Sequence, residues 1–177
     1  MTHTYLIALG SNMRVPDIGN PRRVLAAAVR ATNEAGLCVL AASPIVESAP
    51  IGPSLRRYAN AVAVVETGLE PPELLFALQG LEKQFGRSRA QRRGQRWKAR
   101  ALDLDIILWS GGVWSSDALT IPHREMRGRD FVLSPALAVA RNWRDPVTGL
   151  TFAHLHARWH KAKKRRSTGP EVKRLFG

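Results

Sequence analysis

Two helix-like segments, each with proline at its start and glycine at its end, constrain the fold of this chain most strongly. The first begins at Asn20-Pro21, an N-cap followed by proline at the first helical position, and ends near Gly36. The second begins after Glu70-Pro71-Pro72 and ends at Gly86. Short apolar runs typical of strands surround them, at residues 4–9, 37–47, 58–67 and 102–109. The order strand–helix–strand–strand–helix–strand predicts an α+β fold, a ferredoxin-like α/β sandwich with a mostly antiparallel sheet.

The chain continues beyond this pattern with signals for a hairpin and further helices. Ser110-Gly111-Gly112 is typical of a hairpin turn, and the polar run 113–116 follows it as a strand. A short apolar helix is expected over residues 131–140, with Pro135 in its first turn. A last amphipathic helix is expected over residues 150–160.

Length and composition indicate an ordinary globular protein. The chain has 177 residues, which is enough for one domain with a proper hydrophobic core. Its single cysteine, Cys38, cannot form an intrachain disulfide and gives no sign of an oxidising compartment. The sequence shows neither a signal peptide nor an apolar stretch of about 20 residues. We therefore expect a cytoplasmic monomer without a membrane partner.

The net charge of +13 comes almost entirely from two segments. Residues 83–100 carry eight basic side chains and no acidic one, and residues 158–177 carry eight basic side chains and one acidic one. The second segment is low in apolar residues, so residues 161–177 are expected to form a disordered basic tail. Weak attachment of this tail to nucleic acid or another acidic surface stays open.

A pair of acids lies directly after the first basic segment, in the run RALDLDIILW of residues 100–109. Because side chains alternate along a strand, Asp103 and Asp105 share one face, about 7 Å apart. They repel each other unless they are solvated or bridged by a cation, and carboxylate oxygens suit Mg²⁺. A solvent-facing strip of an ordinary strand is the simplest explanation of such a pair. The basic residues upstream and the run IPHREMRGR downstream favour instead a metal and phosphate site for phosphoryl transfer.

Four patches of the sequence resemble the 6-hydroxymethyl-7,8-dihydropterin pyrophosphokinase family of folate biosynthesis. They are YLIALGSN, ESAPIGP with YANAVAVVET, RW..RALDLDIILW, and IPHREM..RDFVLSPALAVA, and they follow the family's order from residue 5 to residue 140. The resemblance implies transfer of the terminal diphosphate of MgATP to the hydroxymethyl group of a reduced pterin, with release of AMP. It also implies the ferredoxin-like fold and two Mg²⁺ ions. Together with the chain length and the basic tail, it predicts a single catalytic domain over residues 1–160.

The resemblance also implies roles for individual residues. Both metal ions would be held by Asp103 and Asp105. The catalytic set would be Arg89, Arg96, Arg100, Asp103 and Asp105. ATP would contact Gln79, Glu82, Arg89, Arg96, Arg100, Ile106, His123 and Arg129. The pterin would contact Ser48, Ala49, Ile51, Tyr58, Asn60, Trp97 and Phe131, with Asn60 at the amide edge of the ring and aromatic side chains on its faces.

Each of these roles has a simpler alternative. Gln79 and Glu82 could be a solvated pair on one helix face, and the arginines could bind any polyanion. His123 could be structural, the pterin residues could belong to the core, and Gly10-Ser11-Asn12 is expected to be a structural turn.

Some positions depart from the family pattern. Lys98-Ala99 replaces a glycine-proline pair, Ala49 replaces a common proline, and Arg124 replaces an aromatic residue or proline. Two other functions stay open at this point. One is a paralogue with a different pterin or alcohol acceptor, and the other is a ferredoxin-like RNA-binding module, although the aromatic pattern of the common RNA-binding sheet is missing.

Overall fold

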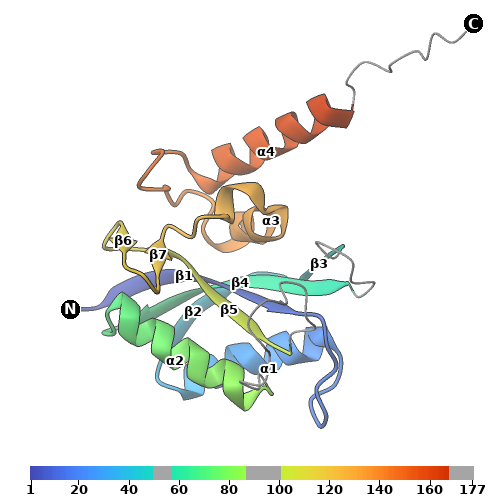
Figure 1. Ribbon diagram of the computed structural model, residues 1–177, viewed down its shortest axis with the longest axis vertical. Coiled ribbons are helices and arrows are strands. Elements are labelled where there is room, and N and C mark those ends of the chain that lie inside the picture. Colours follow the sequence, from blue (N-terminus) through green and yellow to red (C-terminus); the bar gives the residue numbers. More distant parts are fainter. Residues whose placement is uncertain (50–56, 87–100, 168–177) are drawn as a thin grey trace, which may run out of the picture.

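The computed structural model describes residues 1–49, 57–86 and 101–167, which form a sheet with helices on both faces (Figure 1). The first part of the chain contains β1 (His3–Ser11), α1 (Pro21–Glu34), β2 (Cys38–Ala42), β3 (Val46–Ser48), β4 (Tyr58–Thr67), α2 (Pro71–Gln84) and β5 (Asp103–Trp109). The second part contains β6 (Trp114–Ser115), β7 (Thr120–Ile121), the 3-10 helix η1 (Met126–Gly128), α3 (Asp130–Val139) and α4 (Phe152–Ser167).

The main sheet has the strand order β2-β4-β1-β5, and β3 pairs with β4 beside β2. All of these pairs are antiparallel. With α1 and α2 as the two crossover helices, this is the split-βαβ arrangement, so the predicted ferredoxin-like sandwich is confirmed. β5 is an edge strand, and β1 lies in the middle between β4 and β5.

The two faces of the sheet are covered by different helices. In Figure 1, α1 and α2 lie below the sheet, and α3 and α4 lie above it. Because side chains alternate along a strand, each strand contributes side chains to the core on both faces of the sheet. On β1, Ile7 and Leu9 belong to the core cluster under α1 and α2, whereas Leu6 belongs to the cluster under α3 and α4. On β5, Leu104 and Ile106 face α2, so Asp103 and Asp105 face the α3 side, as the alternation predicts.

The helix α1 begins where the sequence predicts, and α2 begins at Pro71, two residues before its predicted start. The side chain of Asn20 accepts a hydrogen bond from the backbone N–H of Arg23 at 3.1 Å and so caps α1. Glu73 accepts a hydrogen bond from the backbone N–H of Glu70 at 2.8 Å as part of a capping box on α2. Such caps stabilise a helix by about 1 kcal/mol because they satisfy donors that have no partner within the helix.

Three strand predictions need correction. The turn predicted at Gly10-Ser11 is wrong, because both residues pair with β4 and belong to β1. The strand predicted over 37–47 is interrupted near Pro44, which has no N–H to donate, and forms β2 and β3. The turn at Ser110-Gly111-Gly112 exists, but β6 pairs with β7 rather than with β5.

Two helix predictions also need correction. Pro135 lies inside α3, beyond its first turn. Residues 161–167, assigned from sequence to the disordered tail, continue α4 to Ser167. Lysine and arginine are good helix formers, and positive charge in a last turn interacts favourably with the helix dipole. Low apolar content therefore does not end a helix whose first turns are already packed. None of the helices in the described ranges is long and apolar enough to cross a membrane.

A buried ion pair joins η1 to the loop that leads into α4. Asp145 is fully buried, and its two carboxylate oxygens accept hydrogen bonds from the Arg127 guanidinium at 2.7 and 2.8 Å. The hydroxyl of Thr148 and the backbone N–H of Val147 also donate to this carboxylate. Burial alone would raise the pKa of Asp145, but these hydrogen bonds outweigh burial and hold the pKa below its ordinary value.

We expect Asp145→Asn to lower the free energy of unfolding by about 2–3 kcal/mol at neutral pH, because the buried pair is broken. The pKa is lower in the folded than in the unfolded protein. The carboxylate therefore stabilises the fold above the unfolded value, about pH 4, and this contribution is lost as the pH falls through the folded value. Urea unfolding at pH 7 and at about pH 3 measures both effects.

Glu34→Gln is the matched control, because it removes one negative charge at an exposed position. It should leave the unfolding free energy within about 0.5 kcal/mol of the parent protein. A loss for Asp145→Asn that is equally large at both pH values would contradict the role given to the ionised carboxylate.

Candidate active site

The centre of the candidate site is a row of three residues across the sheet. In the β1 register, Gly10 lies opposite Asn60 of β4 and opposite Asp103 of β5. All three positions belong to the face that α3 partly covers. A Cβ atom at Gly10 would lie 3.7 Å from Asn60 Oδ1 and 4.0 Å from the Asp103 Cβ. Glycine thus leaves the sheet bare between an amide and a carboxylate.

The second aspartate of the pair lies one step further along the same face. Ala8 is opposite Asp105, so Asp103 and Asp105 project from the same side of β5. Beyond them the register shifts at a bulge, a feature common beside active sites. The two side chains are neither fully buried nor fully exposed. Carboxylate oxygens placed this way on a rigid strand fit Mg²⁺ as ligands, whereas they would not suit a thiolate-binding metal.

Two basic side chains approach Asp105 from the segment after β7. His123 Nε2 lies 3.9 Å from Asp105 Oδ2, and Arg129 Nη1 lies 3.7 Å from the same oxygen. The three residues line a pocket of about 450 Å³ together with Ile106. This volume falls in the range of small-molecule sites, and its charges suit a phosphate group beside a metal ion.

The structure also indicates the protonation state of His123. Burial lowers the pKa of its imidazole, and Arg129 adds to the lowering, while Asp105 opposes it without reversing it. The backbone N–H of Glu125 donates to Nδ1 at 3.1 Å. A neutral ring with this bond carries its proton on Nε2, which is the atom directed at the pocket. We therefore read the contact with Asp105 as polar rather than ionic, and His123 as a neutral donor.

Glu82 anchors the aspartate strand from the other side. The residue is 2% exposed, and Oε1 accepts a hydrogen bond from the backbone N–H of Leu104 at 2.9 Å. Leu104 lies between the two aspartates on an edge strand, so α2 fixes the backbone that carries both. The alternative that Gln79 and Glu82 form a solvated pair on α2 is therefore wrong for Glu82, which is buried, whereas Gln79 is exposed. The sequence analysis missed this hydrogen bond from Glu82 to β5. Helical periodicity shows which residues share a face of the helix, but it does not show how deeply that face is buried.

A second group of predicted residues gathers around Asn60, which is 5% exposed. Its amide nitrogen donates to Ser48 Oγ at 3.0 Å and to the Tyr58 carbonyl at 3.4 Å. These bonds, from which the amide orientation is inferred, direct Oδ1 toward Gly10. Ser48 and Tyr58 face each other across the β3–β4 pair, and Ala49 follows as an exposed residue.

Phe131, at the start of α3, contacts the group around Asp105 through Arg129. It is half-buried against the core cluster of α3 and α4, and the Arg129 guanidinium lies 5.7 Å from the centre of its ring. This cation–π contact orients an arginine that also faces Asp105. Sequence reasoning assigned the two residues to different ligands and did not foresee their contact.

The structure thus brings together Asn60 with Asp103, and Asp105 with His123 and Arg129. Ile106 is buried in the core and also contributes to the pocket wall. Five predicted residues lie outside the described ranges: Ile51, Arg89, Arg96, Trp97 and Arg100. The sequence analysis also missed that Gly10 lies between Asn60 and Asp103. A prediction of the strand lengths and of the pairing register would have shown this position.

Comparisons with known proteins identify the relatives of this chain. A family model described as 7,8-dihydro-6-hydroxymethylpterin-pyrophosphokinase (HPPK) matches residues 6–141. The 2-amino-4-hydroxy-6-hydroxymethyldihydropteridine pyrophosphokinase of Haemophilus influenzae is 39% identical over 139 residues, which cover 77% of this chain and 81% of that protein. The protein of the same name from Pseudomonas aeruginosa is 37% identical, and the match covers 82% of this chain and 86% of that protein.

Solved structures share the fold at much lower identity. A crystal structure of Plasmodium falciparum HPPK-DHPS with pteroate superposes with a TM-score of 0.69 at 12% identity, over 98% of this chain. This chain spans 45% of that longer one, and the likeness shows the common fold alone. From the family match and the curated relatives, the chain belongs to the 7,8-dihydro-6-hydroxymethylpterin-pyrophosphokinase family.

Proposed function

We propose that this chain transfers a diphosphate group from ATP to the hydroxymethyl group of 6-hydroxymethyl-7,8-dihydropterin and releases AMP. The row Asn60–Gly10–Asp103 is the observation that carries the proposal. It places an amide able to read a heterocycle edge, an open floor, and a metal-binding carboxylate next to one another. A flat ring resting on the floor would direct its hydroxymethyl group toward the carboxylate pair.

Asp103 and Asp105 would hold two Mg²⁺ ions with the phosphates of ATP. When bound, these ions neutralise phosphate charge and lower the pKa of the attacking hydroxyl, which reduces the need for a protein general base. The rigid backbone of β5, held by β1 and by Glu82, keeps the two carboxylates at a fixed separation. Fixed ligands limit reorganisation during the reaction.

The phosphates of ATP would lie beside Asp105, where His123 and Arg129 meet. A neutral imidazole N–H and a guanidinium both donate hydrogen bonds to phosphate oxygens, and the guanidinium also supplies positive charge. Arg89, Arg96 and Arg100 are proposed to complete this cover, and Gln79, Glu82 and Ile106 to border the nucleotide.

The pterin would be held on the other side of the row. Asn60, positioned by its bonds to Ser48 and to the Tyr58 carbonyl, would pair with the amide edge of the ring. Tyr58 and Phe131 would flank the ring, since stacking against aromatic side chains suits flat heterocycles. Ala49, Ile51 and Trp97 are proposed to close the pocket. A single catalytic domain over residues 1–160, a monomeric state and a cytoplasmic location stay predictions.

The nucleotide product tests this proposal directly. Incubation with MgATP and 6-hydroxymethyl-7,8-dihydropterin should release AMP in proportion to the pterin consumed, measured by ion-exchange chromatography. ADP as the product, or turnover independent of pterin, would contradict the proposal.

We expect Asp103→Asn and Asp105→Asn each to reduce kcat by about 10³-fold or more, because each removes a charged metal ligand at the centre of charge transfer. Pterin-dependent AMP release at saturating substrate measures this loss. Asp17→Asn removes the same charge from an exposed residue outside the site and should keep parental activity. Near-parental turnover in either active-site variant would exclude it as a metal ligand.

Variants of Glu82 can separate two roles of its side chain: holding the β5 backbone through the Leu104 N–H, and supplying negative charge beside the nucleotide. Glu82→Ala removes the acceptor for the Leu104 N–H, so we expect a loss of about 1–3 kcal/mol in unfolding free energy and a lower kcat. Glu82→Gln keeps a carbonyl acceptor and should recover most of both. The measurements are urea unfolding and AMP release. If Glu82→Gln is as inactive as Glu82→Ala but as stable as the parent, the carboxylate charge serves the nucleotide rather than the strand.

Gly10→Val tests the open floor of the site. Valine suits a strand, so the fold should persist, while its methyl groups fill the space between Asn60 and Asp103. We expect the KM for the pterin to rise about tenfold or more, and Gly10→Ala to give a smaller rise because its Cβ makes only ordinary contacts. Steady-state kinetics and circular dichroism provide the readout. Unchanged pterin KM in Gly10→Val would show that the ring does not rest there.

A further inference from the structure

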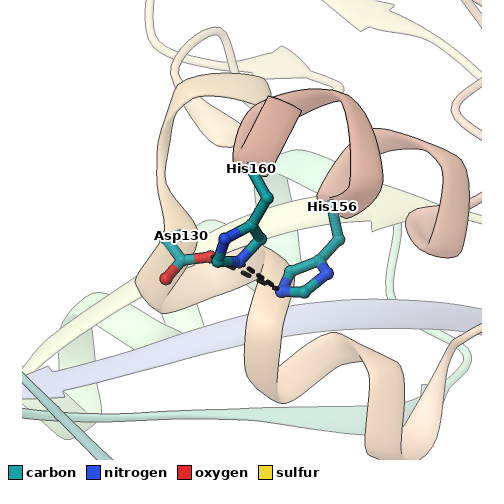
Figure 2. Close-up of side chains that lie close together, drawn as sticks. All are labelled: Asp130, His156 and His160. Carbon is teal, nitrogen blue, oxygen red and sulfur yellow. Dashed lines mark hydrogen bonds and ion pairs between the residues drawn. The ribbon is translucent and has the colours of Figure 1, made fainter. Parts of the chain in front are cut away.

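Three potential metal ligands meet between α3 and α4, outside the candidate active site. Asp130 is the first residue of α3, and His156 and His160 lie one turn apart on α4, so both imidazoles occupy one helix face. Figure 2 shows both rings turned toward the Asp130 carboxylate. The family pattern assigned no role to either histidine.

The donor atoms form a compact triangle. His156 Nε2 and His160 Nε2 are 3.0 Å apart, and Asp130 Oδ1 lies 3.6 Å from the first and 3.4 Å from the second. Tetrahedral zinc holds nitrogen and oxygen ligands at about 2.0–2.2 Å, which places them about 3.3–3.6 Å from one another. The triangle therefore matches one face of a zinc tetrahedron with little movement of the side chains.

The state of the carboxylate oxygen is a second, independent observation. Among the described residues, Asp130 Oδ1 is buried from solvent and accepts no hydrogen bond, although the side chain as a whole is 37% exposed. A buried acceptor without a donor is costly, and such groups call for an explanation. A cation at the centre of the triangle would satisfy this oxygen, and it would replace the hydrogen bond that now joins the two imidazole nitrogens.

We propose that Asp130, His156 and His160 form a binding site for a divalent transition metal, with Zn²⁺ as the preferred ion and water in the fourth position. Imidazole nitrogen favours Zn²⁺, Ni²⁺ and Cu²⁺, whereas Mg²⁺ prefers oxygen ligands alone. The helix around the histidines is strongly basic, with Lys161, Lys163 and Lys164 nearby in sequence. A weakly bound hard cation would be repelled there, whereas coordination by two imidazoles and a carboxylate offsets the repulsion.

Neighbouring contacts hold the ligands in place. The indole N–H of Trp159 donates to the Gly128 carbonyl of η1 at 3.2 Å, and its ring meets His160 edge to face at 4.9 Å. Lys163 lies 5.1 Å above the same indole. These contacts dock α4 against η1 and orient His160, which is the supporting role that outer groups have at metal sites.

The site adjoins the proposed active site through the chain itself. Asp130 lies between Arg129 and Phe131, which contact Asp105 and the core respectively. An ion bound here would pin the first turn of α3 to α4. The proposal does not depend on the reaction, because its test measures binding of the metal alone.

The experiment uses full-length protein freed of any affinity tag. A Cys38→Ser background removes the exposed thiol, and saturating Mg²⁺ is added to fill the metal site proposed at Asp103 and Asp105. Isothermal titration with Zn²⁺ and visible absorption of bound Co²⁺ report affinity and geometry. We expect one equivalent of Zn²⁺ and the strong absorption of tetrahedral Co²⁺.

His156→Gln, His160→Gln and Asp130→Asn should each weaken Zn²⁺ binding by about tenfold or more. His154→Gln is the matched control, because it removes an exposed histidine of the same helix and should leave the affinity unchanged. Circular dichroism verifies that each variant folds. The side chain of His160 is 51% exposed, so its replacement should not disturb the core. Absence of Zn²⁺ binding in the parent, or binding that persists in a His156→Gln/His160→Gln double variant, would overturn the proposal.

Discussion

The pairing register of β1 is the constraint on which the rest of the structure depends. This central strand pairs with β4 on one side and with β5 on the other, so its register aligns Asn60, Gly10 and Asp103. A slip by one residue would turn every side chain of a strand to the opposite face. Both aspartates would then be driven into the apolar layer of α1 and α2. The cost of burying two charges there makes the functional register also the stable one.

The upper face of the sheet is divided between packing and chemistry. Near the middle, Leu6 and Ile107 pack under α3 and α4, while further along the same strands Gly10 and Asp103 lie beyond this cover. The edge position of β5 would leave its outer backbone groups unpaired, and Glu82 supplies an acceptor for one of them. The carboxylates therefore rest on a strand held from both sides, which favours a fixed geometry for metal binding.

Local patterns were enough to predict the core elements and the shared face of the aspartates. Helix caps, the alternation of apolar and polar residues in strands, and glycines at helix ends are each encoded within a few residues. These signals predicted α1, α2 and β4 with nearly correct bounds. Features that depend on distant parts of the chain were missed. The burial of Glu82 follows from how α2 packs on β5, and the meeting of Asp130 with His160 follows from helix docking. The arginine positions implied by family resemblance lie outside the described ranges and stay predictions.

The bare floor at Gly10 has a consequence for inhibitors. An inhibitor that rests between Asn60 and Asp103 would touch main-chain atoms of β1, which no substitution can remove. A side chain introduced at Gly10 itself would displace such a compound. That side chain would also fill the space proposed for the pterin. A substitution at Gly10 that confers resistance to the inhibitor would therefore also reduce enzyme turnover.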